Sequence, residues 1–177
     1  MNTSVFCAFY KEERFMRIKE YSTELDKDKK NVLCEIGYYD VTEDIFDKPE
    51  KIARFAIDQL HLDRRAEEYI YVIGLTTNTQ ALGVFEISHG TVSTSLCNPR
   101  EIFVRLLLRG ASAFVMIHNH PSGNPDPSKA DRMITQKLKE AGDLLGITMI
   151  DSIIIGDHYH LSMKENSNAK LLNRMSI

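Results

Sequence analysis

The pattern of apolar and polar residues along the chain changes repeatedly between the period of a helix and that of a strand. Apolar residues that recur every three or four positions predict helices, whereas short alternating or continuous apolar runs predict strands. The predicted elements are a helix from Pro49 to about Leu60, strands at about Tyr69–Leu75 and Gln80–Ser88, a helix from Pro99 to Arg109, a buried strand at Ala113–Ile117, a helix from Pro127 to Leu145, and apolar strand segments at Ile147–Ile150 and Ser152–Ile155. Strands that alternate with helices indicate a mixed α/β sheet flanked by helices.

The first 48 residues are more polar and show a less regular pattern. They contain one predicted strand, Val32 to Tyr39, which follows the charged run DKDKKN. We interpret residues 1–48 as an N-terminal extension and residues 49–177 as the main domain. The extension could add a strand to the edge of the sheet, contact a partner or be disordered, and the sequence leaves these alternatives open.

Charge and hydropathy restrict the classes of partner. The 177 residues include 22 basic and 25 acidic side chains, for a net charge of −3, and Asp28 interrupts the longest basic run, Lys27–Lys30. Strong sequence-independent DNA binding requires a basic face, so we expect no strong DNA binding from this chain alone. No apolar run approaches the ~20 residues of a membrane span, and we expect no membrane association.

The cysteines indicate the redox environment. Cys7, Cys34 and Cys97 are an odd number and show no C-x-x-C spacing. This pattern argues against a disulfide framework and against a cysteine zinc site. It fits a reducing compartment, and we expect the protein to be cytoplasmic.

The segment from His118 to Asp131 is the strongest chemical motif in the chain, with the spacing H-x-H-x(7)-S-x(2)-D. Alternate residues of a strand point to one face. His118 and His120, which follow the strand Ala113–Ile117, therefore project together while Asn119 is turned away. Two histidines and an aspartate can fill three positions of a zinc tetrahedron and leave the fourth to water, which is typical of a catalytic site.

The residues between the histidines and the aspartate predict a turn and a helix start. Residues 121–125 are all turn formers. Asp126 is a suitable N-cap and Pro127 suits the first helical position. Ser128 and Asp131 would then share one face of the first helical turns and return toward the histidines. The positive end of the helix dipole would also face the site.

A water bound to zinc needs a proton acceptor to complete hydrolysis. Glu86 is the one charged residue inside the strand Gln80–Ser88, and no cation neighbours it in the sequence. It is either a solvent-facing residue or a functional one, and the strand pattern alone does not separate these alternatives.

Two segments, SLCNPREIF and HNHPSGNPDPSKADRMITQKLKEAGDLLGITMIDSIIIGD, closely resemble the RadC-like branch of the JAMM/MPN (JAB) metalloprotein superfamily. The likeness covers roughly Lys48 to Met163. The string HNHPSG-x-P-x-PS-x-x-D and the NPREIF helix start are highly specific to that branch. The resemblance implies the MPN fold, which has a cytidine-deaminase-like layout. A deaminase itself would need H-x-E and P-C-x-x-C, and both are absent.

The resemblance also implies the chemistry of the site. It implies a Zn²⁺ held by His118, His120 and Asp131, with Glu86 as acid/base and Ser128 as hydrogen-bond donor to an oxyanion. In other JAMM branches the reaction is hydrolysis of a peptide or isopeptide bond. The function that we expect is therefore that of a zinc metallopeptidase-like hydrolase, acting on a protein or peptide whose identity the sequence does not give.

Two alternatives remain beside this function. One is a DNA-repair or mobile-element protein whose zinc site is structural or regulatory; the other is a scaffold without catalysis, which would usually lack a ligand or the glutamate. The sequence departs from the family in two places: residues 1–48 show no helix-hairpin-helix pattern, and Asp151 is followed by Ser152 where the family tends to have histidine. A homodimer stays open as an assembly.

Overall fold

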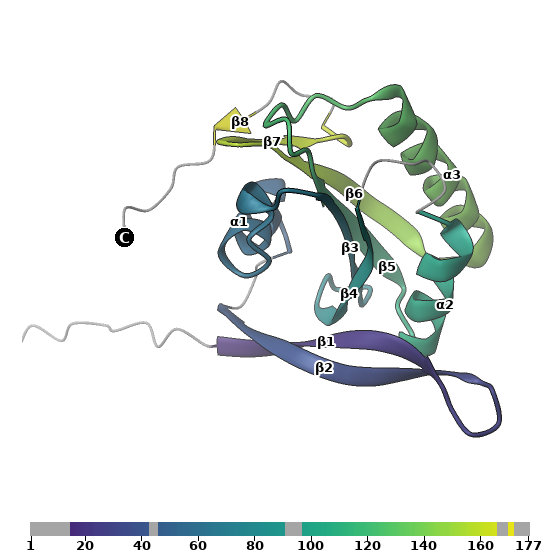
Figure 1. The fold of residues 1–177 in the computed structure, drawn as a ribbon. Coiled ribbons are helices and arrows are strands. Elements are labelled where there is room, and N and C mark those ends of the chain that lie inside the picture. The colour runs from purple at the N-terminus through teal and green to yellow at the C-terminus, as the bar shows by residue number, and fades with distance from the viewer. Residues whose placement is uncertain (1–14, 43–45, 91–96, 166–169, 172–177) are drawn as a thin grey trace, which may run out of the picture.

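A computed structural model describes residues 15–42, 46–90, 97–165 and 170–171 of the chain. Its central element is one eight-stranded mixed sheet, in the order β2-β1-β4-β3-β5-β6-β7-β8. The sheet curves around α1 (Figure 1). This architecture confirms the predicted mixed α/β sheet with flanking helices, and it is consistent with the MPN layout.

The helices and strands predicted from the sequence occur in the expected order, and the structure adds further elements to them. In chain order they are β1 (Phe15–Leu25), β2 (Asn31–Thr42), α1 (Pro49–Asp58), the short 3₁₀ helix η1 (Leu62–Arg64), β3 (Glu68–Leu75), β4 (Ala81–Gly90), α2 (Pro99–Arg109), β5 (Ala113–Asn119), α3 (Lys129–Leu145), β6 (Thr148–Ile155), β7 (Tyr159–Ser162) and β8 (Lys170–Leu171). The two apolar segments predicted before Ile155 form the single strand β6.

Hydrophobic side chains pack on both faces of the sheet and attach different helices to them. On one face, Ile52 and Phe55 of α1 belong to the same buried cluster as Ile117. On the other face, Leu138 of α3 belongs to a buried cluster with Met116 and with side chains of α2. The helices therefore lie on opposite sides of the sheet, with α1 on one side and α2 and α3 on the other (Figure 1). The long strands between them have continuously apolar sequences, because helices cover both faces of the sheet.

The segment before the main domain forms a long hairpin, β1 and β2, at one edge of the sheet. The strand expected from Val32 to Tyr39 is present within β2, but the preceding strand β1 was not predicted from the sequence. Asp26 closes the hairpin turn, because its carboxylate accepts hydrogen bonds from the backbone N–H groups of Asp28 and Lys30. The charged run is therefore a turn between two strands.

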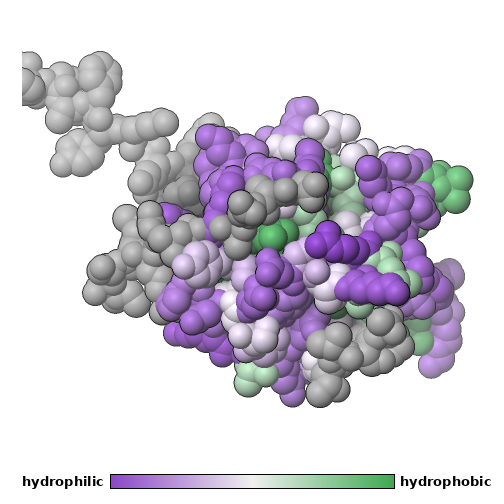
Figure 2. All heavy atoms as spheres, turned by 90° about the horizontal axis from the view of Figure 1, so that it is seen from above, coloured by the Kyte–Doolittle hydropathy of each residue, from purple (hydrophilic) through white to green (hydrophobic). Residues whose placement is uncertain are grey.

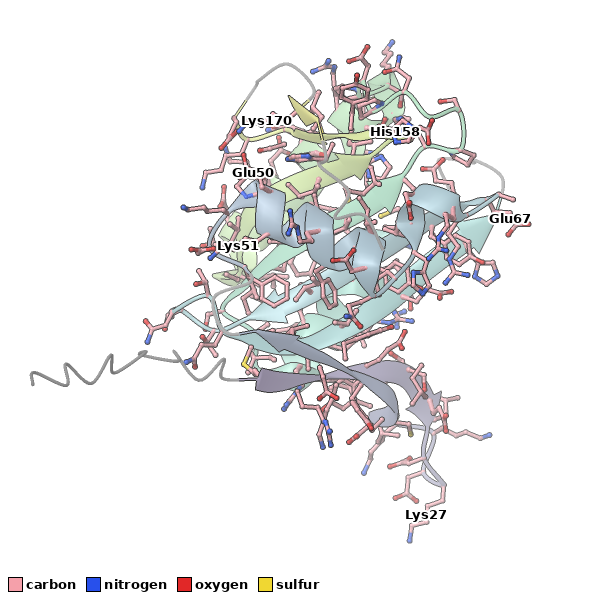
Figure 3. The ribbon with its side chains drawn as sticks, turned by 90° about the vertical axis from the view of Figure 1, so that its left-hand side faces the viewer. Lys27, Glu50, Lys51, Glu67, His158 and Lys170 are labelled. Carbon is pink, nitrogen blue, oxygen red and sulfur yellow. The ribbon has the colours of Figure 1, made fainter. Side chains whose placement is uncertain are left out.

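At the other edge, β7 and β8 complete the sheet near the start of α1. The Lys170 ammonium donates to Glu50 Oε1 and to Glu165 Oε2, both at 2.7 Å. Figure 3 shows Lys170 and Glu50 on the same side of the molecule. The ion pair with Glu50 connects β8 to α1 across 120 residues of sequence.

The surface seen from above is mostly hydrophilic, and its hydrophobic side chains form small separate areas (Figure 2). Exposed apolar residues that are scattered in this way are normal in folded proteins. Within the described ranges, none of the helices combines the length and the apolar character that crossing a bilayer requires.

Candidate metal centre

The carboxyl end of β5 places both histidines of the motif on one face of the sheet. Ile70 of β3 pairs with His118, so both side chains lie on the face that α2 and α3 cover. Beyond the strand, the His120 backbone N–H donates to Ile155 O at 2.9 Å, which fixes the start of the following loop against β6. The imidazoles of His118 and His120 consequently lie close together in an edge-type contact, with ring centroids 5.0 Å apart.

Asp131 reaches these histidines from the first turn of α3. The prediction that Asp126 caps this helix and that Pro127 begins it was wrong, because α3 begins at Lys129 and Ser128 is its N-cap. The Ser128 hydroxyl accepts a hydrogen bond from the Asp131 N–H, and the Asp131 carboxylate accepts one from the Ser128 N–H. This reciprocal capping box satisfies two backbone donors at once, which favours the later start.

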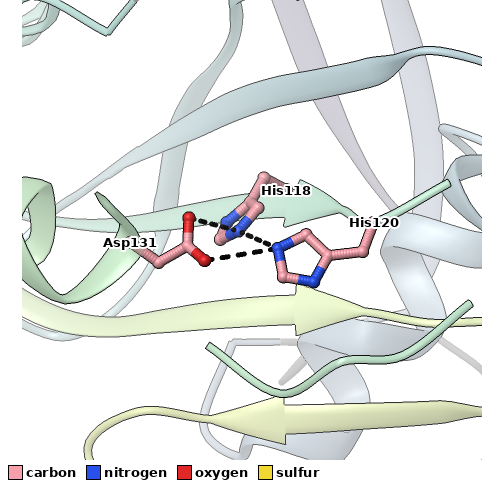
Figure 4. Close-up of side chains that lie close together, drawn as sticks. All are labelled: His118, His120 and Asp131. Carbon is pink, nitrogen blue, oxygen red and sulfur yellow. Dashed lines mark hydrogen bonds and ion pairs between the residues drawn. The ribbon is translucent and has the colours of Figure 1, made fainter. Parts of the chain in front are cut away.

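The ligand atoms of the three residues converge on one point (Figure 4). His118 Nε2 lies 3.2 Å from His120 Nε2 and 3.3 Å from Asp131 Oδ1, and His120 Nε2 lies 3.3 Å from Asp131 Oδ2. Zinc bonds of about 2.0–2.1 Å at tetrahedral angles place two ligand atoms about 3.3 Å apart. The three side chains therefore fit a single metal ion, and they are the one group of this kind among the described residues.

The environment of the group favours the ionised, metal-binding form of Asp131. Burial alone would raise the pKa of Asp131, but hydrogen bonds from His118, His120 and Ser128 outweigh it and hold that pKa well below its ordinary value. The hydrogen bond to Asp131 raises the pKa of His120. His120 Nδ1 also lies 2.8 Å from Asn124 O, which orients the ring and leaves Nε2 for an ion.

The structure gives His118 no such outer partner among the residues that it describes. The His118 Nδ1 atom is buried and has no hydrogen-bond partner there, and the same is true of the Ser152 hydroxyl. Ser152 opposes Met116 on the neighbouring strand β6, so it lies on the same face as His118. Ser152, where the resemblance to the family implies a histidine, therefore lies on the face of the sheet that carries the metal group.

A pocket of about 420 Å³ opens directly beside this group. The residues that line it are Ala66, Glu67, Glu68, Gly90, His120, Pro121, Ser122, Ser128 and Asp131. Two of the three candidate ligands thus face a space that can hold a substrate, which is typical of a catalytic metal site rather than a closed structural one.

Glu68, at the start of β3, brings a further carboxylate to this pocket. Because β3 runs antiparallel to β5, the beginning of β3 lies beside the end of β5. Glu68 alternates with Ile70 and therefore projects on the same face as His118. Burial raises the pKa of Glu68, and the charges of His118, His120 and Asp131 act on the same carboxyl. A carboxyl group with a raised pKa beside a metal group is suited to proton transfer.

Glu86, the acid/base that the sequence suggested, lies elsewhere. It pairs with Tyr71, which pairs with Ile117, so its side chain projects on the face opposite to His118. There its carboxylate accepts a hydrogen bond from the Tyr71 hydroxyl at 2.9 Å and lies 2.7 Å from His89 Nδ1. The sheet separates Glu86 from the metal group, and Glu68 takes its place in the proposal below.

The sequence carried a signal for Glu68 that the strand assignment missed. The predicted strand began at Tyr69, one residue too late, and so excluded the glutamate from the alternating pattern. With Glu68 included, Glu68, Ile70 and Val72 share one face. Knowledge that β3 pairs antiparallel with β5 would then have placed this carboxylate beside His120.

The loop that carries the motif packs tightly on the turn between β6 and β7. The Asp157 N–H donates to Gly123 O at 3.0 Å, and a Cβ atom added at Gly156 would collide with that carbonyl oxygen and contact Pro125.

We expect Gly156→Ala to lower the free energy of unfolding by about 1–3 kcal/mol and to weaken metal binding, because the loop must move. Thermal unfolding with and without Zn²⁺ measures both effects. Gly37→Ala on β2, where the nearest atom is at ordinary contact distance, serves as the control.

Comparison with known proteins agrees with this geometry. The family model described as "RadC-like JAB domain" matches residues 46–168. Proteins named UPF0758 are 37% identical in Desulfitobacterium hafniense, over 74% of this chain and 59% of the relative, and 38% identical in Moorella thermoacetica, over 75% and 57%. In Alkaliphilus metalliredigens the identity is 40%, over 67% of this chain and 50% of the relative. The chain thus spans between half and three fifths of the length of these curated relatives, and it belongs to the RadC-like JAB domain family.

Proposed function

We propose that this chain is a zinc-dependent hydrolase that cleaves a peptide or isopeptide bond. The observation that supports this proposal best is the convergence of His118, His120 and Asp131 beside a pocket that also contains Glu68. Three protein ligands leave one tetrahedral position for solvent or substrate. When bound there, Zn²⁺ would supply Lewis acidity and would favour ionisation of water.

Glu68 moves the proton in the proposed reaction. Its carboxylate takes a proton from the attacking water as the water oxygen forms a bond to the amide carbon. It then gives this proton to the amide nitrogen as the carbon–nitrogen bond breaks, so that the products are a carboxylic acid and an amine. Burial supports this role, because it raises the pKa of Glu68 and makes its carboxylate a better acceptor for the proton of the attacking water.

Ser128 would stabilise the negative charge that develops on the substrate's carbonyl oxygen. Its hydroxyl oxygen accepts a hydrogen bond in the helix cap, and Ser128 also lines the pocket, where its hydroxyl group can donate to a substrate. A donor that is already held in place by a helix cap needs little reorganisation during the reaction.

A purely structural zinc site, as in the DNA-linked alternative, is less consistent with the geometry. Structural zinc sites usually have four protein ligands and are closed to solvent. The described residues offer three ligands, and a pocket adjoins them. The hydrolase therefore remains our proposal.

The proposal can be tested without knowledge of the natural substrate. We suggest incubating the zinc-loaded protein with a mixed peptide library and identifying new termini by mass spectrometry. New amide cleavages should appear, disappear when a chelator removes the metal, and return when Zn²⁺ is added. A fully loaded protein that cleaves no peptide in the library or isopeptide-linked conjugate would contradict the proposal.

Two substitutions of Ser128 separate its role as a helix cap from its role as a donor. Ser128→Ala should cost about 1 kcal/mol of stability, whereas Ser128→Gly should cost only a few tenths, because glycine is tolerated at an N-cap. Both should lower turnover by about 10²–10³ with the zinc content intact. Melting temperatures and cleavage rates measure the two effects. A Ser128→Gly protein with normal turnover would limit Ser128 to the helix cap.

A further inference from the structure

The residue between the two histidines makes a pair of unusual hydrogen bonds. Asn119 is 1% exposed, and within the described ranges both hydrogen bonds of its side chain are to backbone groups. Its Oδ1 accepts a hydrogen bond from the Tyr69 N–H at 2.8 Å, and its Nδ2 donates to Glu67 O at 3.0 Å. These two backbone groups belong to the residues immediately before and after Glu68.

These bonds lie where the backbone ladder between β3 and β5 ends, whereas the ladder between β3 and β4 continues to Glu68 and Gly90. Backbone pairing between β3 and β5 begins at Ile70 and His118, so the first two residues of β3 have no pairing with β5. Strand ends that lack ladder hydrogen bonds open easily. The Asn119 side chain replaces the missing bonds and extends the attachment of β3 to β5 as far as Glu67.

We propose that Asn119 is a positioning residue that holds Glu68 beside the metal group. This inference rests on the proposed function of Glu68, and it names the side chain that fixes the distance between the proton acceptor and the metal ligands. Because His118, Asn119 and His120 are consecutive, one strand end orients two ligands and anchors the acid/base.

The alternation of side chains along β3 supports this role. Figure 3 shows Glu67 at the outer rim of the sheet, with its side chain pointing away from the fold. Glu68 projects on the face of His118, and its charge interacts with all three candidate ligands. Its carboxylate forms no hydrogen bond within the described part of the chain. The Glu68 side chain is therefore positioned by its backbone, and Asn119 holds that backbone on both sides.

The inference can be tested on the cobalt-substituted protein, without a substrate. The visible spectrum of Co²⁺ changes with pH when solvent at the metal ionises, and a carboxylate nearby shifts that transition. We expect Glu68→Gln to move the transition by about one to two pH units. Asn119→Ala and the similarly sized Asn119→Leu should move it in the same direction by a smaller amount, with cobalt content unchanged. In the double variant, Asn119→Ala should add no further shift to that of Glu68→Gln.

A matched control separates positioning from a general loss of stability. Ser162 is also buried, and its hydroxyl donates to Asp151 Oδ2 at 2.6 Å in β6, away from the pocket. Ser162→Ala should lower the melting temperature and leave the cobalt transition in place. The inference would be overturned if the transition were unshifted in both Asn119 variants or if the shifts were additive in the double variant. A loss of cobalt from the Asn119 variants, or an equal shift in Ser162→Ala, would overturn it as well. An unshifted Glu68→Gln would instead contradict the proposed role of Glu68, and the inference with it.

Discussion

Replacing Glu68 by glutamine is expected to lower amide cleavage by about 10²–10⁴, the usual contribution of general acid–base catalysis, while the protein keeps its zinc. Glutamine has nearly the same size as glutamate but cannot accept the proton of the attacking water. The three candidate ligands are not changed by the substitution, so metal content should equal that of the parent. Cleavage rates on a peptide found in the library experiment, together with metal analysis, measure both quantities.

Glu86→Gln is the matched control for this prediction. It makes the same chemical change one strand away, on the opposite face of the sheet, where Glu86 bonds to Tyr71 and His89. This variant should retain the parental cleavage rate and the parental metal content. If Glu86→Gln lost activity while Glu68→Gln kept it, the acid/base would be the residue that the sequence suggested and not the one that the geometry favours.

The outline of the fold was accessible from the sequence because long apolar runs and helix caps are local signals. Asn98 accepts a hydrogen bond from the Arg100 N–H at the start of α2, and Gly110 ends that helix with a φ of 71°. Gly146 ends α3 in the same left-handed conformation. These residues act within one turn of their own position, so their patterns can be recognised without knowledge of the tertiary structure.

The N-terminal hairpin was predicted only in half, for a physical reason. In β1, Ile18 is buried, whereas Arg17 and Lys19 form ion pairs with Asp40 and Glu35 of β2. The strand is thus stabilised by cross-strand pairs as well as by apolar burial. The sequence of a charged strand of this kind has the pattern of a polar extension, and it is recognised as a strand only when its partner strand is known.

The metal group was predicted more completely than the acid/base, because its residues are close in sequence. His118, His120 and Asp131 lie within 14 residues, and one strand and one helix start bring them together. Glu68 is 50 residues before His118, and its place in the site depends on the antiparallel pairing of β3 with β5. Strand pairing of this type is a tertiary property that the sequence does not give directly. Glu86 seemed equally suitable as the acid/base until the structure showed on which face of the sheet each glutamate projects.

Removal of one histidine should abolish firm metal binding. His118→Ala leaves two protein ligands, which rarely hold zinc, so we expect affinity to fall by more than about 10²-fold. Asp131→Asn removes the anionic ligand and keeps a side-chain oxygen that can accept the hydrogen bond from the Ser128 N–H. His158→Ala is the matched control, since the side chain of that histidine is 53% exposed and its ion pair in the described part of the chain is with Asp157. Metal analysis after dialysis gives the occupancy of each variant.

The loss of metal binding should also be visible in the thermal stability of the protein in the presence of zinc. Zinc at about 100 times its dissociation constant stabilises a folded protein by about 2.7 kcal/mol if the unfolded chain does not bind it. For a chain of this length each kcal/mol raises the melting temperature by about 2–4 °C, so zinc should raise it by about 5–10 °C. This increase should be absent in His118→Ala and present in His158→Ala. A His118→Ala protein that keeps full zinc occupancy and the full thermal shift would show that the metal is held by other residues, and the proposed site would have to be abandoned.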